Sequence, residues 1–225
     1  MRRVAAFYRT TVGKKAAMAV TGAILFLFVV GHMWGNLKAF QGPSHFNEYA
    51  EGLRTFGAPF FGRGQLLWVI RLALLAAVGI HILAGVQLWI LARRGRPVGY
   101  ERTPHLELTV ASRTMRWGGL VIAAYVTYHL MHFTFGNAHP DFVPGDAYHN
   151  LVVGFQSVPV VAVYLAATLM LAFHLYHGLW SALQTLGVNH PSYNAWRRGV
   201  ASVLAVLVFA GFMIVPAAVQ LGLVR

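Results

Sequence analysis

The residues of this chain whose type and position could do chemistry are histidines inside long apolar segments. Six of the eleven histidines share this setting: His32, His81, His129, His132, His174 and His177. A histidine at membrane depth is costly, and it usually faces the interior of a helix bundle or a ligand. The neutral imidazole is also a common metal ligand. Hydrogen bonding between packed helices is the alternative role for each of these histidines.

Long uncharged stretches must position these histidines. Residues 16–34, 72–92 and 117–135 carry no charge, and each has about the ~20 residues that a helix needs to cross a bilayer. A fourth stretch begins near Pro159, and a fifth follows Gly199. The pattern predicts an all-α integral membrane protein of one domain, residues 1–225, with five transmembrane helices. The predicted spans are about 16–36, 66–92, 114–136, 158–185 and 199–221.

Composition supports this class and excludes others. The chain is 57% hydrophobic and 11% charged, whereas soluble domains carry about a quarter charged residues. A nucleic-acid partner is not expected, because a phosphate-binding face needs clustered basic residues on a soluble domain. With no cysteine, the chain has no disulfide and no thiolate ligand for iron–sulfur clusters. The basic start, Met1-Arg2-Arg3, is interpreted as leading into a retained first helix, since no small-residue cleavage site follows.

The basic residues predict the orientation. Of the 18 Lys and Arg, 13 fall in the N-terminal segment, the second connection and the fourth connection, and 5 fall on the opposite side. Because cytoplasmic loops carry the excess of Lys and Arg, we expect the N-terminus in the cytoplasm and the C-terminus outside.

Helical rise arranges four histidines at two levels. At ~1.5 Å per residue from the cytoplasmic end, His32 and His129 lie about 24 and 23 Å deep, and His81 and His174 about 16 and 15 Å deep. Each level draws on two different helices. Two histidines that face each other across a bundle are what six-coordinate haem iron requires. Gly85 and Gly178 follow their histidines by one turn, and Gly31 and Gly35 flank His32; missing side chains suit a flat macrocycle.

Several segments resemble one known family. These are Gly-His-Met-Trp-Gly-Asn-Leu (31–37), Ser-Arg-Thr-Met-Arg-Trp-Gly-Gly (112–119), Tyr-His-Leu-Met-His-Phe (128–133) and Phe-His-Leu-Tyr-His-Gly-Leu-Trp-Ser (173–181). Together they are similar to the di-haem cytochrome b membrane anchor of bacterial succinate:quinone oxidoreductases, in its five-helix, single-chain form. The resemblance implies that the first four helices form a haem-binding bundle and that the fifth is peripheral.

The resemblance also assigns ligands. It implies two b haems, with His32 and His129 ligating the distal haem and His81 and His174 the proximal haem. It favours His129 over the neighbouring His132, and His174 over the neighbouring His177.

The resemblance further implies partners and location. FAD and iron–sulfur clusters would belong to a flavoprotein and an iron–sulfur subunit that oxidise succinate or reduce fumarate. This chain would attach both to the bacterial inner membrane and pass electrons to a quinone, usually menaquinone. The resemblance leaves open a higher oligomer of the complex.

Further residues have candidate roles. Arg113 and Arg116 are candidates for pairing with haem propionates, and positive-inside topology is the alternative. Glu48, Glu51 and His132 are candidates for the quinone region, since quinone reduction needs a proton donor. For the two glutamates the alternative is a solvated amphipathic helix at 44–56.

Two other classes stay open. A di-haem cytochrome b of a hydrogenase, a formate dehydrogenase or a b561-like system would also carry paired histidines within the membrane. A carrier with proton-relay histidines should contain acidic residues inside its spans, whereas all six acids lie in predicted connections.

Overall fold

The computed structural model describes residues 2–95 and 110–225, and the regular structure of this part is helical throughout. The helices in chain order are α1 (Arg2–Arg9), α2 (Thr11–Leu37), η1 (Lys38–Gln41), α3 (Pro43–Thr55), α4 (Gln65–Arg94), α5 (Val110–Phe133), α6 (Ala147–Gln156), α7 (Val158–Thr185), η2 (Pro191–Tyr193) and α8 (Asn194–Gln220). The predicted all-α class is confirmed for this part of the chain.

Four helices are long and apolar enough to cross a membrane. They are α2, which continues through η1, then α4, α7, and α8, which continues from η2. They coincide with the predicted spans at 16–36, 66–92, 158–185 and 199–221, and the bounds of α7 agree at both ends. The membrane-spanning character of the chain is therefore supported by four helices.

The remaining predicted span, 114–136, coincides with α5, which is shorter and more polar. It has 24 residues and contains Arg116, His129 and His132. It ends at Phe133, three residues before the predicted limit, because the N–H groups of Thr134 and Phe135 both donate to the carbonyl of Leu130 at 2.9 Å. These bonds close the helix as a C-terminal cap does.

α2, α5 and α8 begin four or five residues before their predicted spans, and the added segment of each contains a basic residue. Lys14 lies inside α2, and its Nζ donates to the carbonyls of Tyr8 and Arg9 at 3.0 and 2.8 Å. Arg197 lies inside α8, and its Nη1 donates to the carbonyl of Val188 at 2.6 Å. Both side chains are buried with carbonyl partners, which makes burial of a charge tolerable.

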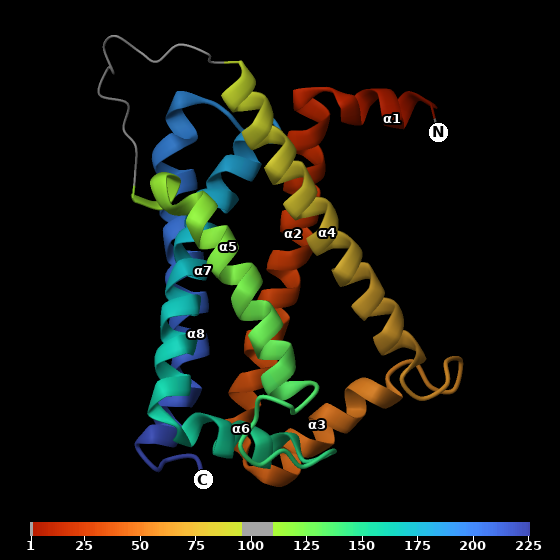
Figure 1. Cartoon of the computed structure of the whole chain (residues 1–225), viewed down its shortest axis with the longest axis vertical. Coiled ribbons are helices and arrows are strands. Elements are labelled where there is room, and N and C mark those ends of the chain that lie inside the picture. Colours follow the sequence, from red (N-terminus) through yellow and green to blue (C-terminus); the bar gives the residue numbers. More distant parts are fainter. Residues whose placement is uncertain (1, 96–109) are drawn as a thin grey trace.

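The long helices form a bundle, and different short helices lie at its two ends (Figure 1). α7 packs against α5 and α8, and α2 packs against α4, α7 and α8. α1 lies across one end. α3, α6 and the C-terminus lie at the other end, which we call the α3–α6 end.

A buried core joins the short helices of the α3–α6 end to the bundle. Phe46 of α3, Tyr148 and Phe155 of α6, Tyr164 of α7 and Val215 of α8 belong to one buried cluster. The prediction of a surface helix at 44–56 matches α3. α6 was not predicted, since its apolar residues are too few to span a membrane.

Asn47 and Asp146 fasten α3 to α6. The side-chain amide of Asn47 donates to Asp146 Oδ1 at 3.0 Å, and Asn47 Oδ1 accepts from the N–H of Tyr148 at 2.9 Å. Asp146 is the N-cap of α6 and accepts from the N–H of His149 at 2.9 Å. This N–H, with the Asn47 amide, holds the pKa of Asp146 below its usual value.

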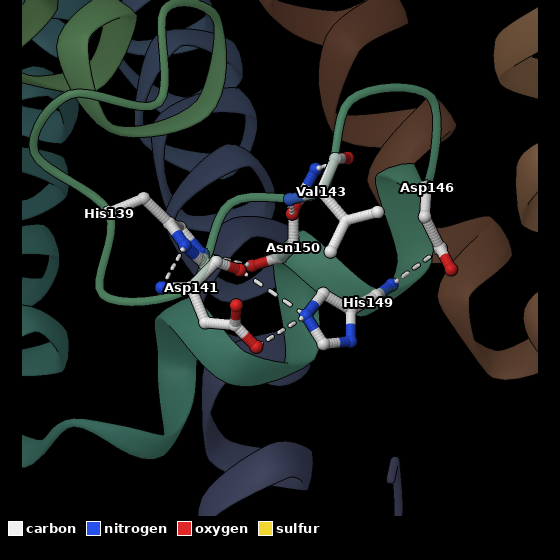
Figure 2. A network of polar contacts seen from close by, with 6 residues as sticks. All are labelled: His139, Asp141, Val143, Asp146, His149 and Asn150. Carbon is white, nitrogen blue, oxygen red and sulfur yellow. Dashed lines mark hydrogen bonds and ion pairs between the residues drawn. The ribbon is translucent and has the colours of Figure 1, made fainter.

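The connection from α5 to α6 is built around Asn150 and His139 (Figure 2). The Asn150 side chain accepts from the N–H of Val143 and donates to the Val143 carbonyl, each at 2.8 Å. His139 Nδ1 accepts from the N–H of Asp141 at 3.0 Å. His139 Nε2 therefore carries the proton and donates to the carbonyl of Asn150 at 2.8 Å. His149 Nε2 lies 3.1 Å from Asp141 Oδ2.

Candidate functional site

His32 of α2 and His129 of α5 lie side by side in the bundle, nearer the α3–α6 end. Their ring centroids are 5.8 Å apart and their planes are nearly perpendicular, at 86°. Phe28 stacks on His32 at 5.5 Å, and Phe212 of α8 approaches it at 6.0 Å. We call His32 and His129 the first pair.

His81 of α4 and His174 of α7 form a second pair, farther from the α3–α6 end. Their ring centroids are 6.1 Å apart, with an interplanar angle of 59°. The structure thus brings together the same partners that helical depth grouped at two levels. Each pair joins helices that are not consecutive in the chain.

The spacing of both pairs suits a metal ion between them. Metal–imidazole nitrogen distances are about 2 Å, so two imidazoles that ligate one ion from opposite sides have ring centroids about 6 Å apart. Within residues 2–95 and 110–225 no group of three or more His, Asp or Glu could hold a metal ion. Haem iron takes its other four ligands from the porphyrin, so two histidines suffice for it.

Backbone contacts orient the ring of His81. Its Nδ1 lies 3.1 Å from the carbonyl of Met18 and 3.2 Å from the hydroxyl of Thr21. A carbonyl only accepts, so Nδ1 carries the proton and Nε2 presents a lone pair. Ligating histidines are usually fixed in this way by an acceptor on the other nitrogen.

His174 is oriented differently. Its Nδ1 is buried with no protein hydrogen-bond partner. His177, one turn later, shares this feature, and its ring packs on Trp180 at 5.3 Å. The hydrogen bonds therefore do not separate the two histidines, but the approach to His81 does, since it is His174 whose ring faces that residue.

Tyr164 of α7 links His129 to His132. Its hydroxyl lies 3.1 Å from His129 Nδ1 and 3.0 Å from His132 Nδ1. A phenol has one proton to donate, so at most one of the two imidazoles accepts from Tyr164, and at least one donates to it. If His129 ligates a metal through Nε2, its Nδ1–H donates to the hydroxyl of Tyr164. No sequence spacing pointed to Tyr164.

His132 is fully buried in the core of the α3–α6 end. Its ring stacks on Tyr128 and His139, at 5.5 and 5.0 Å between centroids, and its Nε2 has no hydrogen-bond partner. A Cβ on Gly154 would lie 3.0 Å from this ring, so the missing side chain makes room for it. As a quinone candidate, His132 therefore offers no exposed surface.

The other quinone candidates lie on α3. Glu48 is exposed. Glu51 accepts from Arg54 at 3.0 Å and from Arg63 Nη2 at 2.8 Å. The Arg54 and Arg63 guanidinium groups hold the pKa of Glu51 below its usual value, so this carboxylate stays ionised near neutral pH. That favours a surface role for Glu51 over proton donation.

The arginines proposed for haem propionates are at the opposite end. Arg116 places its guanidinium 5.8 Å from the centroid of Trp89, a ring that Arg93 also covers at 5.0 Å. Arg113 belongs to α5, but its side chain lies outside the described residues. The contact of Arg116 with Trp89 joins α5 to α4 at this end.

The glycines near the histidines differ in what surrounds them. A Cβ on Gly31 or Gly178 would meet no protein atom within 4 Å, and one on Gly85 would meet only Met18 Sδ, at 4.0 Å. These three leave open helix surface, as a flat ring requires. Gly35 instead accommodates the ring of Tyr49, whose hydroxyl would lie 2.9 Å from an added Cβ.

Comparison of the chain with models of protein families, with curated proteins and with solved structures gives no match.

Proposed function

We propose that the chain is a di-haem cytochrome b that anchors a succinate:quinone oxidoreductase in the membrane. The observation that carries the proposal is the pair of cross-bundle histidine contacts, 5.8 and 6.1 Å between ring centroids, at two levels of one membrane-embedded bundle. In this proposal α5 crosses the membrane as well, because its His129 faces His32 of the spanning helix α2.

Four histidines would hold the haems: His32 and His129 for one, His81 and His174 for the other. Bound haem supplies one-electron redox chemistry. Met18 and Tyr164 orient His81 and His129 through hydrogen bonds to Nδ1. Leu171, Leu175 and Phe212 belong to an apolar cluster between α2, α7 and α8, and such packing keeps water from the ring nitrogens.

Topology and partners complete the proposal. The basic ends of α4 and α5 would face the cytoplasm of a bacterial cell, with the C-terminus outside. A flavoprotein with FAD and an iron–sulfur subunit would dock on the basic end, close to the second pair. Menaquinone would react near the first pair, at the α3–α6 end. Of the two glutamates proposed there, Glu48 makes no ion pair within the part of the chain that the structure describes.

Haem content tests the proposal directly. The purified chain should bind two b haems, measured by pyridine haemochrome absorbance per mole of protein, with two components in low-temperature reduced-minus-oxidised spectra. Fewer than two haems per chain would contradict bis-histidine ligation at both pairs.

The assignment to succinate chemistry needs a second measurement. Co-expression with the flavoprotein and the iron–sulfur subunit of a succinate:quinone oxidoreductase should yield membranes that reduce a menaquinone analogue with succinate. That activity should be lost from the membrane when this chain is deleted. A chain that binds two haems but supports hydrogen or formate oxidation instead would belong to another di-haem cytochrome b system.

A further inference from the structure

Three arginines gather at one recess at the α3–α6 end of the molecule. The recess has a volume of about 320 Å³ and is lined by Arg54, Arg63, Gly64, Leu67, Trp68 and Arg71. Only five basic residues of the chain were placed on this side of the membrane, and three of them line this one recess. Topology does not require basic residues here, so their convergence needs another cause.

Local structure brings the arginines together from three elements. The N–H of Gly64 donates to the carbonyl of Arg54 at 2.6 Å, which fastens the end of α3 to the start of α4. Arg63 immediately precedes this junction. Arg71 follows on α4, where its guanidinium lies 5.0 Å from the centroid of Trp68.

The recess is positively charged even after its internal ion pairs are counted. Glu51 neutralises one charge and contacts both Arg54 and Arg63, so the three guanidinium groups leave a net charge of about +2 with it. The N-cap of α4, Gly64, provides no side-chain hydrogen bond, and the positive end of the helix dipole adds to the field. This combination suits a phosphate group, which guanidinium groups bind in bidentate fashion.

The position of the recess favours a lipid head group as the source of the phosphate. Trp68 and Arg71 lie on the first two turns of a spanning helix, where a helix enters the bilayer, and Trp68 is 58% exposed. Tryptophan at this level packs against lipid, and basic clusters beside spans attract anionic head groups. Leu67 and Trp68 give the recess an apolar wall next to its charges.

We propose that this recess binds the phosphate of an anionic phospholipid in the leaflet at the α3–α6 end. Arg54, Arg63 and Arg71 contact the head group, and Trp68 packs against its glycerol and upper acyl chain. Glu51 competes with the phosphate for Arg54 and Arg63 and thereby limits the affinity. This site is separate from both histidine pairs and holds whether or not they carry haem.

Titration of the full-length protein in a neutral detergent tests the site, with bound lipids counted by native mass spectrometry. The probes are dioleoyl phosphatidylglycerol and dioleoyl phosphatidylcholine. Wild type should prefer phosphatidylglycerol, and Arg63→Gln with Arg71→Gln should weaken its binding about tenfold. Arg225→Gln, which removes an arginine elsewhere at the same end, should leave it unchanged.

A variant that binds the lipid more tightly than wild type cannot be explained by misfolding, so a second variant tests for such a gain. Glu51→Gln should bind phosphatidylglycerol about threefold more tightly than wild type, because it frees two guanidinium groups. Wild-type affinity in the double arginine variant, or no gain in Glu51→Gln, would overturn the proposal. Displacement of phosphatidylglycerol by an equal concentration of inorganic phosphate would overturn the assignment to a lipid.

Discussion

The two histidine pairs have nearly the same ring separation but different surroundings. In the second pair, His81 is fixed by a backbone carbonyl of α2, while His174 has an unpartnered Nδ1. In the first pair, His129 shares the hydroxyl of Tyr164 with the buried His132. The same pairing of imidazoles thus has a backbone acceptor at one level and a side-chain hydrogen-bond network at the other. If both hold haem, the protein sets different redox potentials through these contacts.

Substitution of a histidine is expected to have the largest effect, a loss of bound haem. A substitution in one pair should leave the haem at the other pair in place. His174→Ala should reduce the haem content from two per chain to one, and His129→Ala should remove the other haem, because each iron loses one of its two protein ligands. Pyridine haemochrome absorbance and low-temperature spectra measure the loss.

His177→Ala is the matched control for His174→Ala, since it removes a buried histidine one turn away. It should keep two haems. Retention of both haems in His174→Ala and also in His81→Ala would contradict ligation by the second pair.

A smaller effect is expected from crowding His81. A Cβ on Gly22 would lie 3.2 Å from His81 Cε1, so the ring would have to shift against its hydrogen bond to the carbonyl of Met18. Gly22→Ala should therefore weaken haem retention at the second pair alone, by about 10-fold or more, in a haem-transfer assay. Gly79→Ala, whose Cβ would meet no atom within 4 Å, should retain haem as wild type does.

Tyr164→Phe tests the network at the first pair. Without the hydroxyl, His129 Nδ1–H loses its acceptor, the imidazole becomes a weaker electron donor, and the potential of that haem should rise. One hydrogen bond of ~1 kcal/mol corresponds to about 40 mV for one electron. Redox titration should show the shift in one haem only. An equal shift in both haems, or a shift in Tyr176→Phe on the same helix, would argue against a local hydrogen bond.

The smallest effect is expected at the α6 cap, which stabilises the end that carries the first pair. Asp146→Ala should lower the free energy of unfolding by about 1 kcal/mol, the usual cost of losing an N-cap. Thermal unfolding in detergent measures it. Asp141→Ala, which removes only an exposed partner of His149, should cost less than half of this amount.

The N-cap residue Asp146 also predicts how the stability of the protein changes with pH. Because the pKa of Asp146 is lowered in the folded state from its ordinary value of about 4, its contribution to stability is present in full above about pH 4 and is lost as the pH falls through the lowered value. Asp146→Ala should therefore be less sensitive than wild type to acidification below about pH 4. Equal acid sensitivity of both proteins would contradict this role.

Much of the fold could be predicted, because it follows from local chemistry. α7 was predicted at both ends, since Pro159 marks its start and a turn-prone segment follows it. α2 and α8 begin earlier than predicted, since an uncharged window measures apolar length rather than helix length. Basic residues such as Lys14 and Arg197 fit inside a helix when carbonyls accept from them.

The histidine partners were also predictable, but their hydrogen bonds were not. A constant rise per residue put His32 level with His129 and His81 level with His174. Tyr164 could not be found this way, because its hydroxyl reaches residues of another helix, 32 and 35 positions away in sequence. Haem ligation itself stays a prediction.

The sequence by itself determined that this is a helical membrane protein with histidines at two depths, because hydrophobicity and helical rise are properties of a segment. The tertiary structure alone decided which imidazole nitrogen is bonded, that His132 is sealed in a core with α6, and that three scattered arginines line one recess. Those features depend on contacts between segments far apart in the chain, and no local period encodes them.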